Sequence, residues 1–340
     1  IQLSCNQLSK AIETFSSFLV KYPESESYGS ILLKRATAYA NLKKFSKAQE
    51  DYEKYLDTFP ADSNSSKVLT NLLDVTKNEK TRQNYIDKYK NKIKNVSTIS
   101  FNEGKKYFYE QNYSKAVEIF EKFIKENKKD KNYNEACYLL AESYRLTKDF
   151  DKSISLYNSL ANQEGSPFAI KSLIKLGLIY KGRGDHANAI KYFEKLKLKS
   201  KTNRDKYVAL NGLMHENYLT QNFEQAINYA NGCLELNLEN TNIFIDSKMM
   251  LLRCNFELNR FDQVLKMSQS YLKDNRFASS FDEILFLKAE SLYSTKKFGD
   301  SLNTLFDLTK KYQNSRWFDD CYILMAKNYI AQNRITQANK

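Results

Sequence analysis

The chain is poor in the residues that turns and loops need, because its 340 residues include only 3 prolines and 9 glycines. β-Sheets and long irregular loops rely on both residue types, so this composition favours helices joined by short turns. No apolar run approaches the roughly 20 residues that a membrane-spanning helix needs. Hydrophobic residues still make up 42% of the chain and aromatic residues 14%, which is enough to build a core.

Residues typical of reactive sites are also scarce. The chain has no glycine-rich phosphate loop, no H-E-x-x-H zinc motif and no nucleophile elbow. Neither of its two histidines, His186 and His215, has a second ligand type at helical spacing, and His186 is expected to pack between helices. The five cysteines form no C-x-x-C pair, which favours small buried thiols. We therefore expect no enzymatic activity, no metal and no cofactor.

What the chain does contain is an internal repeat. A small or apolar anchor residue recurs at Ala11, Ala48, Ala116, Ser153, Ala189, Ala226, Val264, Ser301 and Ala338. Successive anchors are 37, 68, 37, 36, 37, 38, 37 and 37 residues apart, and 68 is twice 34. A bulky residue precedes each anchor by three positions, as Phe45 precedes Ala48. A mostly small residue precedes it by twelve, as Gly177 precedes Ala189. A fixed period of this length indicates stacked helix pairs.

Paired antiparallel helices explain these positions. Small residues twelve positions apart let the first helix of a repeat (helix A) and the second (helix B) approach closely, and the bulky residue fills the space at their turn. One helix pair cannot bury its own apolar face, so the repeats must stack. The sequence therefore predicts an all-α solenoid of about eight to ten helix-pair repeats.

The order of a small residue, an aromatic residue, alanine, a second aromatic residue and proline resembles the tetratricopeptide repeat (TPR). FSKAQEDYEKYLDTFP (residues 45–60) shows part of this pattern, and the resemblance extends over nearly the whole chain. It implies a right-handed α–α superhelix. The chain departs from the family in its period, which is mostly 37 rather than 34, and in its closing proline, which remains only as Pro23 and Pro60.

The repeat endings give an expectation about location. Tyr22-Pro23-Glu24-Ser25 is similar to endings in bacterial cell-envelope repeat proteins. These include the Tol-associated periplasmic repeat protein and the repeat lipoprotein of the outer-membrane barrel-assembly machine. This resemblance implies the bacterial periplasm or the periplasmic face of the outer membrane; without it, the cytoplasm is the expectation.

One segment lacks the repeat signature. Two short helices are predicted within residues 65–99, but counting 34 from Ala48 gives Arg82, a cation that is costly to bury in a tight helix crossing. We therefore predict N-terminal repeats over 1–64, a degenerate helical repeat and possible joint over 65–99, and a C-terminal array over 100–340. The first and last repeats look truncated, so we expect the chain to be part of a longer protein.

The net charge is +13, from 53 basic and 40 acidic residues. Lysines and arginines gather in two segments, 77–94 and 195–206. These segments fall at predicted helix ends and turns, where cations favour solvent and helix C-termini, and no stacking aromatics interleave them along a groove. A solvated surface is favoured, an acidic protein or anionic lipid partner stays open, and nucleic acid is disfavoured.

The resemblance also implies a binding face. In a superhelix of this family the A helices line the concave surface, and residues at offsets −6, −3, +1, +4 and +5 from the small A-helix residue face a partner. The candidate partner-binding residues are Phe101, Phe108, Tyr109, Tyr138, Glu142, Arg145, His215, Tyr218, Arg253, Phe256, Phe286, Glu290 and Tyr293. Arginine and aromatic residues are enriched where proteins dock. For the +4 aromatics, the alternative is packing between neighbouring repeats.

These observations predict a non-catalytic scaffold that binds a protein or extended peptide, within a multi-subunit assembly of the bacterial envelope. No small-molecule substrate is expected. The alternative is a basic adaptor that binds anionic surfaces or nucleic acid through its lysine-rich helix ends, and charge-driven binding of that kind should weaken steeply with salt.

Overall fold

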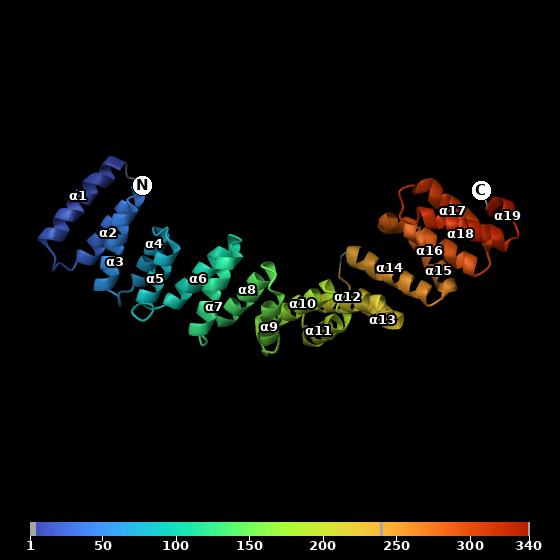
Figure 1. The fold of residues 1–340 in the computed structure, drawn as a ribbon, viewed down its shortest axis with the longest axis horizontal. Helices are drawn as coiled ribbons and strands as arrows, with labels where there is room; N and C mark the ends of the chain where they lie inside the picture. The colour runs from blue at the N-terminus through green and yellow to red at the C-terminus, as the bar shows by residue number, and fades with distance from the viewer. Residues whose placement is uncertain (1–4, 239–240, 339–340) are drawn as a thin grey trace. The chain divides into compact units, whose positions relative to one another are not determined.

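The computed structural model describes residues 5–238 and 241–338, and all regular secondary structure within them is helical (Figure 1). The chain divides into two compact units, residues 1–156 and 157–340, which are called the N-terminal and C-terminal units. The predicted all-α fold class is confirmed. None of the described helices combines the length and the apolar character that crossing a membrane requires.

Helices of the N-terminal unit follow one another as A and B members of successive repeats. They are α1 (Cys5–Lys21), α2 (Tyr28–Asn41), α3 (Phe45–Thr58), α4 (Ser65–Asp74), α5 (Glu79–Tyr89), α6 (Val96–Tyr109), α7 (Tyr113–Glu126), α8 (Tyr133–Leu146) and the beginning of α9 (Phe150–Ala161). Here α2, α4, α6 and α8 are A helices.

The C-terminal unit continues the same alternation. Its helices are the end of α9, then α10 (Pro167–Gly182), α11 (His186–Lys199), α12 (Asn203–Leu219), α13 (Phe223–Glu235), α14 (Thr241–Glu257), α15 (Phe261–Tyr271), the 3₁₀ helix η1 (Asn275–Ser280), α16 (Phe281–Ser294), α17 (Phe298–Lys311), α18 (Phe318–Ala331) and α19 (Ile335–Ala338). Counted over the described residues, α2 to α19 form nine A–B pairs that follow α1, in agreement with the predicted eight to ten.

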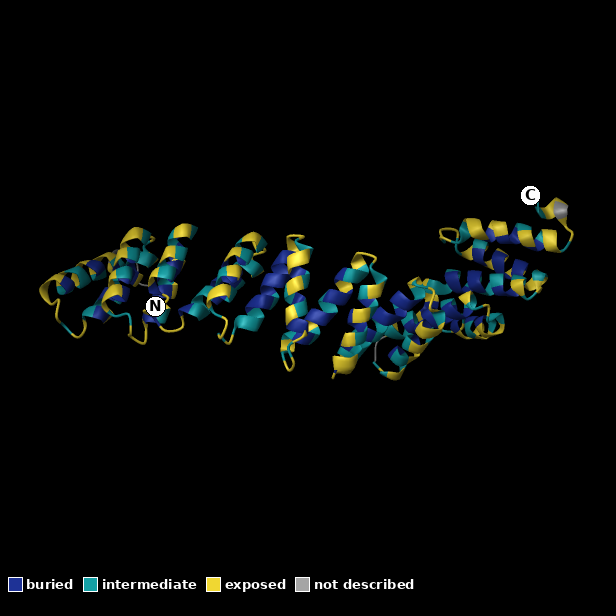
Figure 2. Cartoon of the chain, turned by 60° about the horizontal axis from the view of Figure 1, so that its bottom comes forward, coloured by how far each residue is buried: buried dark blue, intermediate teal, exposed yellow. Residues whose placement is uncertain are grey.

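Small residues do bring the two helices of a repeat together. At two anchors the residue is serine, and its hydroxyl donates to the backbone carbonyl twelve residues earlier: Ser153 Oγ lies 2.9 Å from Ala141 O, and Ser301 Oγ 2.9 Å from Ala289 O. Buried hydroxyls need such partners, so serine is tolerated at a position where most other repeats have alanine. Figure 2 shows the result, with buried residues on the facing sides of successive helices and exposed residues at the turns.

The turn from helix A to helix B is the same in every regular repeat. The residue five positions before the anchor has a φ between 55° and 71°: Lys43, Gln111, Lys148, Gly184, Gln221, Asn259, Lys296 and Asn333. The next backbone N–H then donates to the carbonyl five residues earlier, as Asn112 N does to Tyr107 O at 2.9 Å. This is the Schellman helix ending, which satisfies carbonyls at the helix terminus. Glycine occupies only one of these turns, which explains how short turns coexist with so little glycine.

The turn from helix B to the next helix A is stabilised by a hydrogen bond from a backbone N–H to a side-chain oxygen two residues earlier. Ser25 Oγ accepts a hydrogen bond from Ser27 N at 3.2 Å, and Ser315 Oγ accepts one from Trp317 N at 3.1 Å. Asp62 Oδ1 plays the same part with Asn64 N at 2.7 Å. Side-chain acceptors of this kind stabilise turns before a helix. The serine of the Tyr22-Pro23-Glu24-Ser25 ending therefore has a local structural role.

The degenerate segment differs from the regular repeats in length and turn. Helices α4 and α5 have 10 and 11 residues, and residues 75–78 between them contain no left-handed residue. Arg82 is buried but paired: its Nε donates to Glu103 Oε1 of α6 at 2.8 Å, and its Nη1 donates to Thr76 O at 3.1 Å. A core cluster extends from Leu19 to Val96 across this segment. The boundaries at 64 and 99, and the joint between them, stay a prediction.

Within the C-terminal unit, successive A helices lie closer to one another than successive B helices do. Contacts join α10 to α12, α12 to α14, α14 to α16 and α16 to α18, whereas no comparable contact joins α11, α13, α15 and α17 to one another. Because the A helices are more closely spaced than the B helices, the A side is the inner side of the curve within this unit.

Candidate functional site

The A helices carry recurring cross-repeat ion pairs, which we call the A-helix ladder. The residue one position after the small A-helix residue of one repeat meets the residue six positions before the small residue of the next. Three pairs follow this rule, with nitrogen–oxygen distances of 2.8, 3.1 and 2.6 Å: Lys105–Glu135, His215–Asp246 and Arg253–Glu283. Because the repeats stack in register, one pair of offsets brings these side chains together each time.

Asp246 of α14 is held by two side chains of α12. Its Oδ2 lies 3.1 Å from His215 Nε2 and 2.8 Å from Asn211 Nδ2. Burial would raise the pKa of Asp246, but the hydrogen bonds and positive charge of its neighbours hold that pKa below its ordinary value. Asp246 is therefore ionised at neutral pH, and it links α12 to α14.

The next pair links α14 to α16. Arg253 donates from Nε and Nη2 to the two carboxylate oxygens of Glu283, at 2.6 and 2.8 Å. Arg316 Nη2, just before α18, lies 3.3 Å from the same carboxylate. Two-point contact of this kind gives the guanidinium a defined orientation. The Arg253 side chain is 28% exposed, so part of it remains available at the surface.

The ladder changes character at its next step. The same two offsets, applied to α16 and α18, select Glu290 and Asp320, and both of these residues are acids. Burial raises the pKa of Glu290, Lys327 lowers it, and the negative charges of Asp320 and Glu257 raise it further. At this step the ladder offsets therefore carry two acids, with no cation or imidazole at the +1 position.

Four predicted partner-binding aromatics close the A–B turn of their own repeat. Each contacts the aromatic residue at the start of helix B, with ring centroids 5.6 to 6.1 Å apart in tilted or edge geometry: Phe108–Tyr113, Tyr218–Phe223, Phe256–Phe261 and Tyr293–Phe298. Such geometry is favourable for aromatic pairs. All four are half-buried, so they stabilise the turn and still show part of the ring at the surface.

Two other predicted aromatics lie inside the core. Phe101 packs against Phe120 and Phe123, with centroids 6.1 and 5.7 Å away, and it is only 3% exposed. Phe286 stacks on Trp317 at 4.6 Å and is 7% exposed. A partner could reach these rings only if the core opened.

The remaining predicted residues of the N-terminal unit vary in exposure. Tyr109 is 69% exposed and has an edge contact with Phe108. In α8, Glu142 is buried and accepts a 2.9 Å hydrogen bond from Arg145 Nη2, while burial raises the pKa of the half-buried Tyr138 to about 12. The predicted residues thus fall into one group in each unit, and their contact with a partner stays a prediction.

Five A-helix residues that form these cross-repeat contacts are absent from the sequence prediction: Lys105, Glu135, Asn211, Asp246 and Glu283. They nevertheless occupy the +1, −3 and −6 offsets counted from the small A-helix positions of their repeats. The signal for the three acids is a basic or imidazole side chain at the +1 position of the preceding repeat. That signal is visible only when consecutive repeats are compared position by position.

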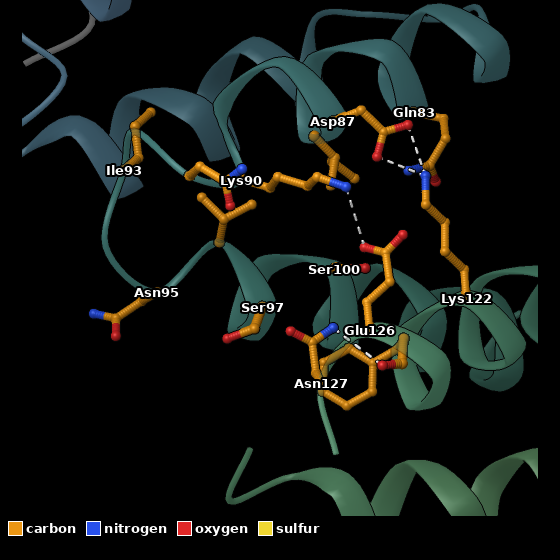
Figure 3. Close-up of a pocket in the computed structure, with 14 residues that line it drawn as sticks. Gln83, Asp87, Lys90, Ile93, Asn95, Ser97, Ser100, Lys122, Glu126 and Asn127 are labelled. Atoms are coloured by element: carbon orange, nitrogen blue, oxygen red, sulfur yellow. Dashed lines mark hydrogen bonds and ion pairs between the residues drawn. The ribbon is translucent and has the colours of Figure 1, made fainter. Parts of the chain in front are cut away.

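A cleft of about 550 Å³ opens between α5, α6 and α7 of the N-terminal unit (Figure 3). Lys122 of α7 lies 2.6 Å from each carboxylate oxygen of Asp87, and Lys90 Nζ lies 3.6 Å from Glu126 (Figure 3). These ion pairs connect α5 and the residue after it to α7. The cleft is therefore lined by charges that already neutralise one another.

No group of three histidine, cysteine, aspartate or glutamate side chains that could hold a metal ion occurs in the part of the chain that the structure describes. His186 has a different role: its Nδ1 lies 2.7 Å from Glu216 Oε2, whose side chain is fully buried in α12. This contact links α11 to the next repeat. Each histidine thus pairs with one carboxylate of a neighbouring repeat.

Family models of the tetratricopeptide repeat match residues 31–62, 101–170 and 170–197. These segments match the tetratricopeptide repeat, so the predicted resemblance to this family is confirmed. Repeats of this family typically serve as non-catalytic scaffolds for protein interaction. No curated protein sequence matches the chain.

Several solved structures are similar to the chain. The C-terminal part of a TPR repeat-containing protein from Cytophaga hutchinsonii has 18% identity over 71% of this chain and 95% of its own, with a TM-score of 0.43. PilW, a type IV pilus biogenesis factor, has 19% identity over 66% of this chain and 98% of its own, also with a TM-score of 0.43. A tetratricopeptide repeat protein from Parabacteroides merdae has 12% identity over 87% and 98%, with a TM-score of 0.34.

Proposed function

We propose that this chain is a non-catalytic scaffold that binds a protein or an extended peptide along its A-helix face, within a multi-subunit assembly. The observation that supports it best is the A-helix ladder. It holds arginine, histidine and carboxylate groups in defined positions beside half-buried aromatic rings. Residues that are already ordered lose little entropy when a partner docks, which favours binding.

The rival function, a basic adaptor for anionic surfaces or nucleic acid, is less well supported by the charge pattern. In the segment 77–94, Lys88 Nζ lies 2.6 Å from Glu53 and 2.9 Å from Asp57, and Arg82 is buried against Glu103. These cations are occupied within the fold. In the segment 195–206, Lys197 pairs with Glu194 at 2.7 Å, but Lys201 and Arg204 are exposed.

Site-specific photo-crosslinking in the producing cells tests the proposal. A photoreactive residue would replace Tyr109 or Tyr293 on the A-helix face, and as a matched control Leu198, which is 81% exposed on the B helix α11. We expect the A-helix positions to capture a protein that the control position does not. Tyr109→Ala should then weaken affinity for that protein about tenfold, as loss of a well-placed aromatic contact does.

The rival function is tested with a charge-reversal variant and a salt titration. If the double variant Lys201→Glu/Arg204→Glu abolishes binding, and binding of the wild type falls steeply with salt while Tyr109→Ala has no effect, the basic adaptor is the better description. Crosslinks that arise at Leu198 alone would also contradict the A-helix face as the docking surface.

We further propose that the assembly lies in the bacterial envelope, at the periplasmic side of the outer membrane. The support for this is the resemblance of the Tyr22-Pro23-Glu24-Ser25 ending to those of envelope repeat proteins. Fractionation of cells that produce the full-length protein tests it. Recovery with a periplasmic marker is the expected result, and recovery with a cytoplasmic marker would contradict this location.

A further inference from the structure

A surface groove of about 590 Å³ lies between α7, α8 and α9 of the N-terminal unit. Its floor is formed by Leu140 and Tyr144 of α8, both buried, and its walls include Ile124 of α7 and Leu156 of α9. The volume falls within the range of about 300–1,000 Å³ that is typical of ligand pockets. Two B helices flank this groove, so it is separate from the A-helix face.

The rim of the groove is positively charged. Its charged lining residues are three lysines, Lys125, Lys128 and Lys152, against one glutamate, Glu121. The Tyr144 hydroxyl donates a hydrogen bond to that glutamate, so the acid already has a partner. Within residues 5–238 and 241–338 no carboxylate forms an ion pair with Lys125 or Lys128.

Lys152 extends this rim over the aromatic floor. Its Nζ lies 4.9 Å from the centre of the Tyr144 ring, a cation–π distance, and 3.3 Å from Asp149 Oδ2. Its side chain is still 60% exposed, so the pair with Asp149 is a surface contact that contributes little free energy and can be exchanged. An incoming carboxylate could therefore meet three lysines around one apolar hollow.

We propose that this groove binds an acidic peptide segment of a partner protein, with one large apolar side chain of the segment in the hollow and flanking carboxylates on the lysine rim. The apolar floor is recessed between helices beneath the lysines, whereas a membrane surface needs apolar side chains that protrude. Charge complementarity selects an acidic partner, and the hollow selects one with an apolar anchor. This second docking surface does not depend on the function proposed for the A-helix face.

The probe is a short fluorescein-labelled peptide of alternating glutamate and leucine, and its binding is followed by fluorescence anisotropy at low and moderate salt. Two matched peptides replace the leucines by alanine or the glutamates by lysine. We expect the glutamate–leucine peptide to bind more than about tenfold tighter than the alanine peptide, because the anchor buries apolar surface. The lysine peptide should not bind.

Protein variants locate the site. Lys128→Glu and Lys152→Glu should each weaken binding of the glutamate–leucine peptide about three- to tenfold, since each reversal loses one attraction and adds one repulsion. Lys106→Glu is the matched control, because Lys106 is an exposed lysine of α6 outside the groove. It should leave binding unchanged, and circular dichroism should show all three variants folded.

Three results would overturn the proposal. Equal loss of binding in Lys106→Glu would indicate non-specific attraction to a basic surface. Equal binding of the alanine peptide would exclude the apolar hollow as the anchor site. Binding to vesicles of phosphatidylcholine and phosphatidylserine that depends on Lys128 and Lys152, without binding of the peptide, would assign the rim to an anionic lipid surface. None of these results bears on Tyr109 or the A-helix face, so the two functions are tested separately.

Discussion

Gly177 of α10 and Gly212 of α12 enclose the ring of Phe193 from two helices. A Cβ atom at Gly177 would lie 2.6 Å from Phe193 Cε1, and one at Gly212 would lie 2.7 Å from the same ring. Phe193 is 1% exposed and cannot move away from both. The small A-helix position Gly177 therefore accommodates the aromatic residue four positions after the anchor of its own repeat, and Gly212 of the next repeat leaves room for the same ring from the other side.

Gly177→Ala should destabilise the chain by about 1–2 kcal/mol. Overpacking of a filled core costs about 1–3 kcal/mol, and alanine regains about 0.5–1 kcal/mol of helix stability. Gly299→Ala is the matched control, because no atom lies within 4 Å of a Cβ there, and it should stabilise α17 slightly. Urea unfolding midpoints of the two variants check this prediction. A gain of stability in both would show that the close approach is not restrictive.

The pair of His215 and Asp246 makes a pH-dependent prediction. A carboxylate whose pKa is lowered in the folded state stabilises the fold above its unfolded pKa, and this contribution disappears as the pH falls through the folded pKa. The ordinary value is 3.8, so the link between α12 and α14 should weaken below about pH 4.

Removal of the His215 imidazole should raise the pKa of Asp246. In His215→Ala, burial continues to raise the pKa of Asp246 while one hydrogen bond and one nearby charge are lost, so the pKa should rise. Carboxyl carbon chemical shifts, measured by NMR during a pH titration, report this directly. His186→Ala is the control, because His186 contacts Glu216 instead. An unchanged Asp246 pKa in His215→Ala would show that the other neighbours determine it.

Between elements, the buried pair of Arg82 and Glu103 links α5 to α6. Both side chains are less than one-tenth exposed, and Arg82 also donates to the carbonyls of Leu73 and Thr76 at the end of α4. The desolvation cost of the cation is thereby offset by a carboxylate and two carbonyls. This arrangement explains how an arginine can occupy a position where regular repeats have a small residue.

Arg82→Met should destabilise the N-terminal unit by about 3–5 kcal/mol, because it leaves the Glu103 carboxylate buried without a charged partner. The double variant Arg82→Met/Glu103→Met should recover most of that loss, since apolar replacement of both partners is often neutral. Thermal unfolding of the single and double variants measures the difference. A cost below about 1 kcal/mol in the single variant would contradict this role.

For the whole molecule, the weakest place is predicted to be residues 65–99. Each repeat is stabilised mainly by its immediate neighbours, so a short repeat without the regular turn should open first. In limited proteolysis we expect the first cleavage between Ala61 and Thr98, and faster cleavage there in Arg82→Met. Protection of this segment equal to that of residues 104–338 would show that the core cluster from Leu19 to Val96 makes the array continuous.

The sequence alone determined the repeat, and with it the fold. The spacing of anchors, bulky residues and small residues predicted helix pairs because local sequence decides which side of a helix is apolar and where a helix can approach another. The degenerate segment was also visible, because Arg82 interrupts the pattern. These are short-range properties that recur in every repeat, so they can be recognised in the sequence without knowing how the repeats stack.

Only the tertiary structure decided what the individual side chains do. The carboxylates at 135, 246 and 283 find their cationic or imidazole partners about 30 residues away, on another helix. Phe101 and Phe286 were predicted for the surface but lie in the core, because the −3 offset faces a neighbouring helix at these repeats. Lysine and glutamine at left-handed turn positions carry no sequence signal, since the Schellman hydrogen bonds, rather than residue type, stabilise that conformation. The groove between α7, α8 and α9 likewise exists only after stacking brings three helices together.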